Sequence, residues 1–135
     1  MNKTFLSWIP ALIFMGVIFC LSSIHGDKIH LPDFSYSDKV AHFFAYAFLG
    51  WLISLRQVLR GSARVGFGNA GGLDAMGQIV GMLYGASDEF HQMFVPLRDA
   101  SVYDWNADAL GIMAGSWVCR KMFRKVWNRD PLPEA

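Results

Sequence analysis

The chain has 135 residues, of which 53% are hydrophobic and 17% are charged, and its formal net charge is +1. This length allows one domain, the small net charge excludes the basic surface that nucleic-acid binding requires, and Cys20 and Cys119 form neither a disulfide framework nor a CxxC motif. Because ordinary soluble domains contain about 25% charged residues, the composition indicates a small membrane protein.

The first predicted element covers residues 5–24, which contain no charged side chain. A helix of about 20 residues crosses the hydrocarbon layer of a bilayer. The alternative is a cleaved signal peptide that begins at Lys3, but its apolar part would usually be about 7–15 residues long and would be followed by an A-x-A site, and no such site follows residues 5–24 directly. We therefore predict an uncleaved membrane span, in which Pro10 is tolerated because it lies near the helix start.

Three further helices are predicted at residues 38–59, 70–91 and 102–123, followed by a cytoplasmic tail at residues 124–135. The second helix contains a long uncharged run, whereas the third and fourth reach the length of a span only by including acidic residues. Charged groups at membrane depth are costly and normally face the bundle interior or a wet cavity. We therefore predict an all-α fold, a four-helix transmembrane bundle made of residues 1–135 as a single domain.

Lysine and arginine predict the orientation of this bundle. Nine of the 12 lie on the side that holds both termini, and only Lys28, Lys39 and Arg98 lie on the other side. Because positive residues are enriched in cytoplasmic segments, we predict a multi-pass protein of the cytoplasmic (inner) membrane with both termini in the cytoplasm. A polar pocket is then expected at the outer ends of the last three helices.

The polar side chains at these outer ends have helical spacing. Asp38, His42 and Tyr46 follow one another at intervals of four residues, and Glu89 and Gln92 are three residues apart. Residues at these intervals share a helix face, so each helix presents its polar groups together. The predicted ligand-binding residues are Lys39, His42, Tyr46, Glu89, Gln92, Arg98, Asp104 and Asp108, and the candidate catalytic residues are Glu89, His42 and Asp38.

The pattern resembles the VanZ-like family of small integral membrane proteins, over roughly residues 5–120. A D-K-x-x-H-F-x-x-Y element opens one helix, E-x-x-Q precedes a V-P-x-R turn, and a D-x-x-x-[ND]-x-x-G element opens the last helix. Leu97 stands where the turn often has Gly, and Asp108 stands where many members carry Asn. The family name implies a link to antibiotic resistance, namely low-level resistance to the glycopeptide teicoplanin. The matching residues are Asp38, Lys39, His42, Phe43 and Tyr46; Glu89 and Gln92; Val95, Pro96 and Arg98; and Asp104, Asp108 and Gly111.

Three interpretations of the polar residues stay open. In the first, the pocket recognises an anionic lipid-linked or cell-envelope ligand, and Arg98 is the anchor because a guanidinium binds phosphate or carboxylate through two hydrogen bonds. Lys39 and His42 would assist. In the second, the protein is an enzyme in which Asp38 orients His42 as a base and Glu89 exchanges protons.

The enzyme interpretation includes a metal-dependent form, in which acids together with His42 and His91 hold a divalent cation. The third interpretation is an interhelical ion-pair network with a structural role only. We recognise no cofactor motif and assign no metal ligand, and we expect membrane lipids and a lipid-linked cell-wall intermediate as partners. The residues of the expected network are Asp38, Lys39, Glu89, Arg98 and Asp104.

Overall fold

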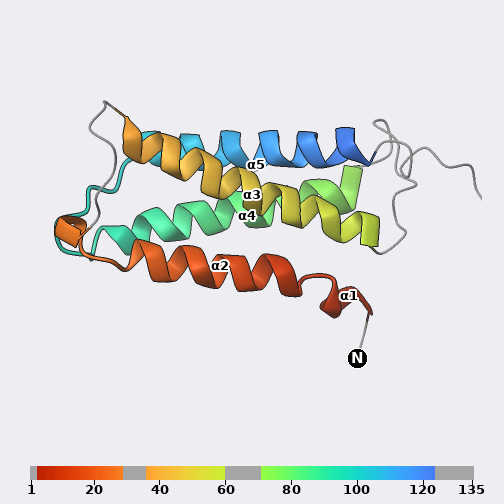
Figure 1. Cartoon of the computed structure of the whole chain (residues 1–135), viewed down its shortest axis with the longest axis horizontal. Coiled ribbons are helices and arrows are strands. Elements are labelled where there is room, and N and C mark those ends of the chain that lie inside the picture. Colours follow the sequence, from red (N-terminus) through yellow and green to blue (C-terminus); the bar gives the residue numbers. More distant parts are fainter. Residues whose placement is uncertain (1–2, 29–35, 60–70, 124–135) are drawn as a thin grey trace, which may run out of the picture.

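The computed structural model describes residues 3–28, 36–59 and 71–123, and within them it contains helices and no β-strand. Four long helices run alternately up and down beside one another (Figure 1). The predicted all-α fold with four main helices is confirmed, and the predicted tail lies outside the described residues. The elements are α1 (Lys3–Leu6), α2 (Ile9–Ser22), η1 (Gly26–Lys28), α3 (Ser37–Leu59), α4 (Gly71–Gln92) and α5 (Val102–Met122).

The first predicted helix, residues 5–24, is wrong in its extent. α1 ends at Leu6, and the N–H of Trp8 donates to the carbonyl oxygen of Phe5 at 3.0 Å in the turn that follows. Pro10 lies in the first turn of α2, which has only 14 residues. Proline has no N–H, and its ring collides with the carbonyl four residues earlier, which favours a break between Leu6 and Pro10 over one continuous helix.

α3 and α5 form the closest helix pair of the bundle. Gly111 and Gly115 of α5 lie directly against the main-chain carbonyl groups of Phe43 and Ala47 of α3, where a Cβ atom would collide. Small residues at such positions let two helix backbones approach closely. The glycine spacing therefore fixes the contact between α3 and α5, and with it the position of the polar residues that both helices carry.

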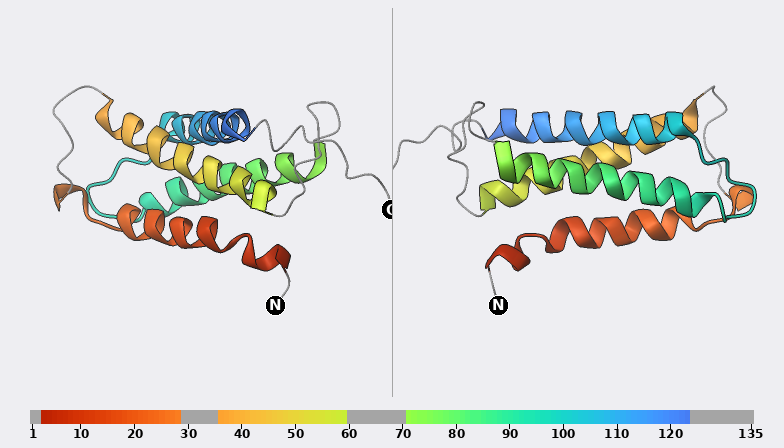
Figure 2. Two further views of the ribbon diagram at one scale, coloured as in Figure 1. Left: turned by 45° about the vertical axis from the view of Figure 1, so that its right-hand side comes forward. Right: turned by 180° about the vertical axis from the view of Figure 1, so that it is seen from behind.

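α2 covers α3 and α4 on the side away from α5 (Figure 2). The hydroxyl group of Tyr84 in α4 donates a hydrogen bond to the carbonyl oxygen of Met15 in α2 at 2.6 Å, which ties these two helices together. The apolar core between the helices is formed by Ala11, Ile18, Tyr46, Leu49, Ile53 and Ile112.

Large apolar side chains also cover the outer surface of all four long helices. No helix in the described parts of the chain combines the length and the hydropathy that a membrane span requires. The predicted spans and their orientation therefore stay predictions. The outward-facing residues that each expose at least 48% of their surface include Ile13, Phe19, Phe44, Phe48, Ile79, Leu83, Leu110, Met113 and Trp117.

Candidate functional site

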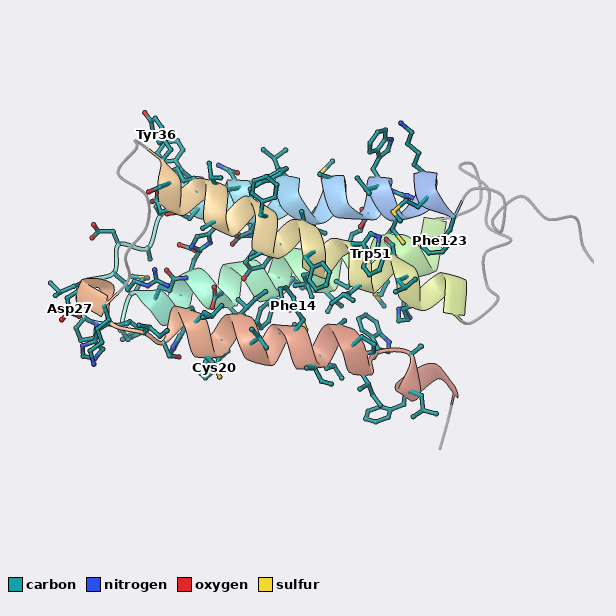
Figure 3. The ribbon with its side chains drawn as sticks, viewed as in Figure 1. Phe14, Cys20, Asp27, Tyr36, Trp51 and Phe123 are labelled. Atoms are coloured by element: carbon teal, nitrogen blue, oxygen red, sulfur yellow. The ribbon has the colours of Figure 1, made fainter. Side chains whose placement is uncertain are left out.

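The polar residues identified in the sequence lie together at one end of the bundle. α3 and α5 begin there, α4 ends there, and η1 lies beside the end of α4 (Figure 1). In Figure 3, Asp27 and Tyr36 mark this end, and Phe123 marks the opposite end. Ser101 caps α5, because its hydroxyl oxygen accepts a hydrogen bond from the N–H of Tyr103 at 3.0 Å. The alternating directions of the helices thus bring three distant sequence segments into one site.

His42, Glu89 and Asp108 meet at the centre of this end, each from a different helix. The Nδ1 atom of His42 lies 3.0 Å from Oδ1 of Asp108 and 3.5 Å from Oε1 of Glu89. The side chain of Asp108 is fully buried, and those of His42 and Glu89 are only 12% and 10% exposed. Asp108, and not the predicted Asp38, therefore orients His42. Oε2 of Glu89 accepts a hydrogen bond from the main-chain N–H of Ser101 at 2.9 Å, which joins the end of α4 to the start of α5.

Lys39 connects two acids at the start of α3 and α5. Its Nζ atom lies 2.8 Å from Oδ2 of Asp38 and 3.0 Å from Oδ1 of Asp104. The Asp104 side chain is only 4% exposed, whereas that of Asp38 is 48% exposed. Lys39 therefore neutralises the buried carboxylate of Asp104. Its ammonium group, which was expected to assist in anion binding, is already paired with acids of the protein.

Asp88 is absent from the predicted set of ligand-binding residues, although its spacing from Gln92 places both on one helix face. Asp88 is buried, and its Oδ2 atom accepts a hydrogen bond from Nε2 of Gln92 at 3.1 Å. Tyr46 is buried beside it and beside Asp108. Among the described residues no hydrogen-bond partner is found for the Tyr46 hydroxyl group or for one oxygen each of Asp88, Glu89 and Asp108. Since buried polar atoms nearly always have a hydrogen-bond partner, these four atoms leave positions open for water or a ligand.

Two adjoining cavities of about 360 and 190 Å³ lie at this end of the bundle. The larger cavity extends from the polar end along apolar side chains of α2 and α3, so it is amphipathic. The smaller one lies under η1 and the loop between α4 and α5, and its wall includes Asp104. The residues that line both cavities are Asp38, His42, Gln92 and Arg98.

Arg98 is held over the helix ends by the turn between α4 and α5. The main-chain N–H of Arg98 donates a hydrogen bond to the carbonyl oxygen of Val95 at 3.3 Å, and the preceding residue, Leu97, has a φ of 59°. This left-handed conformation favours glycine, which agrees with the glycine that the VanZ-like turn often has there. Gly26 of η1 donates to the carbonyl oxygen of Pro96 at 3.2 Å and lies too close to Leu97 to carry a Cβ atom. The guanidinium of Arg98 forms no ion pair or hydrogen bond with another described residue.

α2 was not predicted to contribute to the pocket, yet Ile18, Leu21 and Ile24 of this segment line the larger cavity. These apolar residues carry no sequence signal that separates a cavity wall from a lipid-facing surface. His91 faces α2 as well, with Nε2 3.0 Å from Oγ of Ser23. Among the described residues, the group of side chains that could hold a metal ion contains His42 but not His91.

These features define the chain as a small helical-bundle protein with a charged, partly enclosed site at an end of the bundle. The family model described as VanZ/LLP1 matches residues 5–124, and the chain belongs to this family, as the sequence motifs predicted. No curated protein and no solved structure matches the chain.

Proposed function

We propose that this VanZ/LLP1 protein resides in a membrane and binds an anionic, lipid-linked ligand of the cell envelope in its amphipathic cavity. The apolar side chains exposed on α2, α3, α4 and α5 support the membrane location. Soluble monomers rarely expose apolar surface on every side, because it is costly to hydrate. The distribution of lysine and arginine supports an orientation in which both termini are cytoplasmic and the pocket faces outward.

The shape and lining of the larger cavity support a ligand with an acyl chain and an anionic head. Its volume of about 360 Å³ is in the range of known ligand pockets. Ile18 and Leu21 of α2 and Ala45 of α3 offer an apolar wall, and the polar groups gather at one end of it. An acyl chain would contact the wall, while the head group would reach the polar end beside Arg98.

The single observation that carries the proposal is that the guanidinium of Arg98 has no ion-pair partner among the described residues. It lines both cavities, and acids line them too, yet it forms no ion pair with a described residue. A guanidinium binds phosphate or carboxylate through two parallel hydrogen bonds and is therefore the natural anchor of the anionic head.

The same observation weighs against a purely structural ion-pair network. Such a network was expected to include Arg98 and Glu89, but the ion pairs of Lys39 reach only Asp38 and Asp104. Glu89 lies beside His42 instead. Glu89 and Arg98 are thus outside the Lys39 pairs, and Arg98 forms no ion pair with a residue of the described ranges.

Native mass spectrometry of the gently extracted full chain tests this proposal. We expect a co-purifying phosphate-bearing lipid on the wild-type protein and its loss from Arg98→Ala, while Lys28→Ala, which removes an exposed cation of η1 at the same end, retains it. The added mass distinguishes a lipid-linked phosphate from free phosphate. Retention of the lipid by folded Arg98→Ala, or absence of any anionic lipid from the wild type, would overturn the proposal.

The family name connects VanZ proteins with teicoplanin resistance, and a cell-envelope ligand is consistent with that connection. If ligand binding underlies such resistance, expression of the wild-type chain in a susceptible host would raise the inhibitory concentration of teicoplanin. Arg98→Ala at equal expression would not raise it.

A further inference from the structure

The pocket has an excess of negative charge that an anion-binding site has to compensate. The carboxylates of Asp38, Asp88, Glu89, Asp104 and Asp108 gather around it, whereas Lys39 and Arg98 are its permanent cations within the described part of the chain. Lys39 is already paired with two of these acids. The charge of the remaining buried acids is costly unless a further cation is present, since isolated buried charges are strongly destabilising.

Three potential metal ligands converge where this charge is most buried. One ligand atom each from His42, Glu89 and Asp108 lies within 4.8 Å of the other two. The three residues come from α3, α4 and α5, so the packing of the helices, and not a flexible loop, brings them together. Around an ion with ligands at about 2.1 Å, tetrahedral neighbours are about 3.4 Å apart. The present distances of 3.0 and 3.5 Å from His42 Nδ1 to the two carboxylates are already close to this value.

Buried, unpartnered oxygen atoms provide a second observation beside the cluster itself. Tyr46 is 1% exposed and Asp88 is 3% exposed, and no described residue is hydrogen-bonded to the hydroxyl group of Tyr46 or to Oδ1 of Asp88. Tyr46 lies one turn after His42, with its ring parallel to the imidazole. Gly85 lies against both the Tyr46 ring and Oδ2 of Asp108, so these groups share one wall of the site. Water bound to a metal ion at this site would supply hydrogen-bond partners to these atoms.

We propose that His42, Glu89 and Asp108 bind one divalent transition-metal ion such as Zn²⁺ or Mn²⁺. One imidazole nitrogen and two carboxylate oxygens form a mixed ligand set, which suits these ions better than Mg²⁺ or Ca²⁺ with their preference for oxygen alone. Three protein ligands leave at least one coordination position for water or for an incoming ligand. Binding requires neutral His42, and Nδ1 then exchanges its contact with Asp108 for the metal.

The metal explains how an acidic pocket binds an anion. It adds two positive charges beside His42, a residue that lines both cavities together with Arg98. A phosphate group could then be held between the metal and the guanidinium. This role of the metal rests on the proposed function, whereas metal binding by the three residues does not.

Isothermal titration of the EDTA-treated full chain in detergent with Zn²⁺ or Mn²⁺ alone tests the site. We expect one ion per chain for the wild type and a dissociation constant at least about tenfold higher for His42→Gln and for Glu89→Gln, since even residues that only support a ligand contribute about that much. His91→Gln is the matched control, because it removes an imidazole of the same end that is hydrogen-bonded to Ser23, and its affinity should equal that of the wild type. If His42→Gln does not fold, the nearly isosteric Asp108→Asn serves in its place.

Absence of metal binding to the wild type at millimolar concentration, or equal affinities of His42→Gln and His91→Gln, would overturn the metal site. Lipid mass spectrometry of the same samples separates the two proposals. A lipid lost from Arg98→Ala without any metal binding supports the proposed function alone. Metal binding by a protein whose Arg98→Ala variant keeps its lipid supports the metal site alone.

Discussion

Replacing Lys39 by Met removes the cation from two acids that differ greatly in burial. Nζ of Lys39 lies at similar distances from both, 2.8 Å from Asp38 and 3.0 Å from Asp104. The side chain of Asp104 is 4% exposed and that of Asp38 is 48% exposed, so water can replace the ammonium at Asp38 but not at Asp104. The cost of the substitution should therefore come almost entirely from Asp104.

Breaking a buried ion pair by removing one partner costs about 3–5 kcal/mol, and an exposed pair contributes about 0–1 kcal/mol. Because Lys39 itself is 26% exposed, we expect the lower end of the first range, about 3 kcal/mol for Lys39→Met. The single substitution Asp38→Asn should cost less than about 1 kcal/mol. The double variant with Lys39→Met and Asp104→Asn should recover most of the loss, because it leaves no unpaired buried charge.

Thermal unfolding in detergent, followed by circular dichroism, measures these differences. A loss of about 3 kcal/mol in a chain of this size lowers the melting temperature by roughly 10 °C. The reasoning fails if Lys39→Met and Asp38→Asn lower the melting temperature equally, or if adding Asp104→Asn to Lys39→Met does not restore stability.

Three smaller changes test the local structure by the same melting assay. Gly115→Ala places a Cβ atom against the main chain of Ala47 and should lower the free energy of unfolding by about 1–3 kcal/mol. An unchanged melting temperature would refute the tight contact of α3 and α5. Leu97→Gly relieves a left-handed conformation that costs a non-glycine residue about 1–2 kcal/mol, so it should leave stability equal or higher, and a clear loss would contradict this. Ser101→Ala removes the hydrogen bond from Tyr103 at the start of α5 and should cost about 1 kcal/mol, whereas Ser101→Thr should not.

The extents of α3, α4 and α5 were predicted to within one residue at each end because their polar ends and long apolar runs mark them in the sequence. The first helix was predicted too long. Its composition is uniformly apolar on both sides of Pro10, so the pattern contains no boundary, and only the steric effect of the proline ring on the preceding turn interrupts it.

Helical spacing predicted which polar residues share a helix face, but it could not predict contacts between helices. The approach of Glu89 and Asp108 to His42 depends on how closely α4 and α5 pack against α3. The glycines of α5 set the distance between α5 and α3, and Gly77 and Gly81 of α4 lie against Ile53 of α3. The sequence therefore suggested Asp38 as the partner of His42, since Asp38 is the acidic residue one turn away on the same helix. Arg98 was predicted as the anchor, and the structure places it in the lining of both cavities, while the role itself stays a prediction.

The most direct measurement is the affinity of the full chain, in maltoside micelles, for dodecyl phosphate against dodecanol. The two compounds share an acyl chain and differ in the anionic head, so their difference isolates the contribution of the anion. We predict that the wild type binds dodecyl phosphate at least about tenfold more tightly than dodecanol, and that Arg98→Ala loses this preference while Lys28→Ala keeps it. Equal affinities for the two compounds, or an undiminished preference in folded Arg98→Ala, would contradict anion recognition at Arg98.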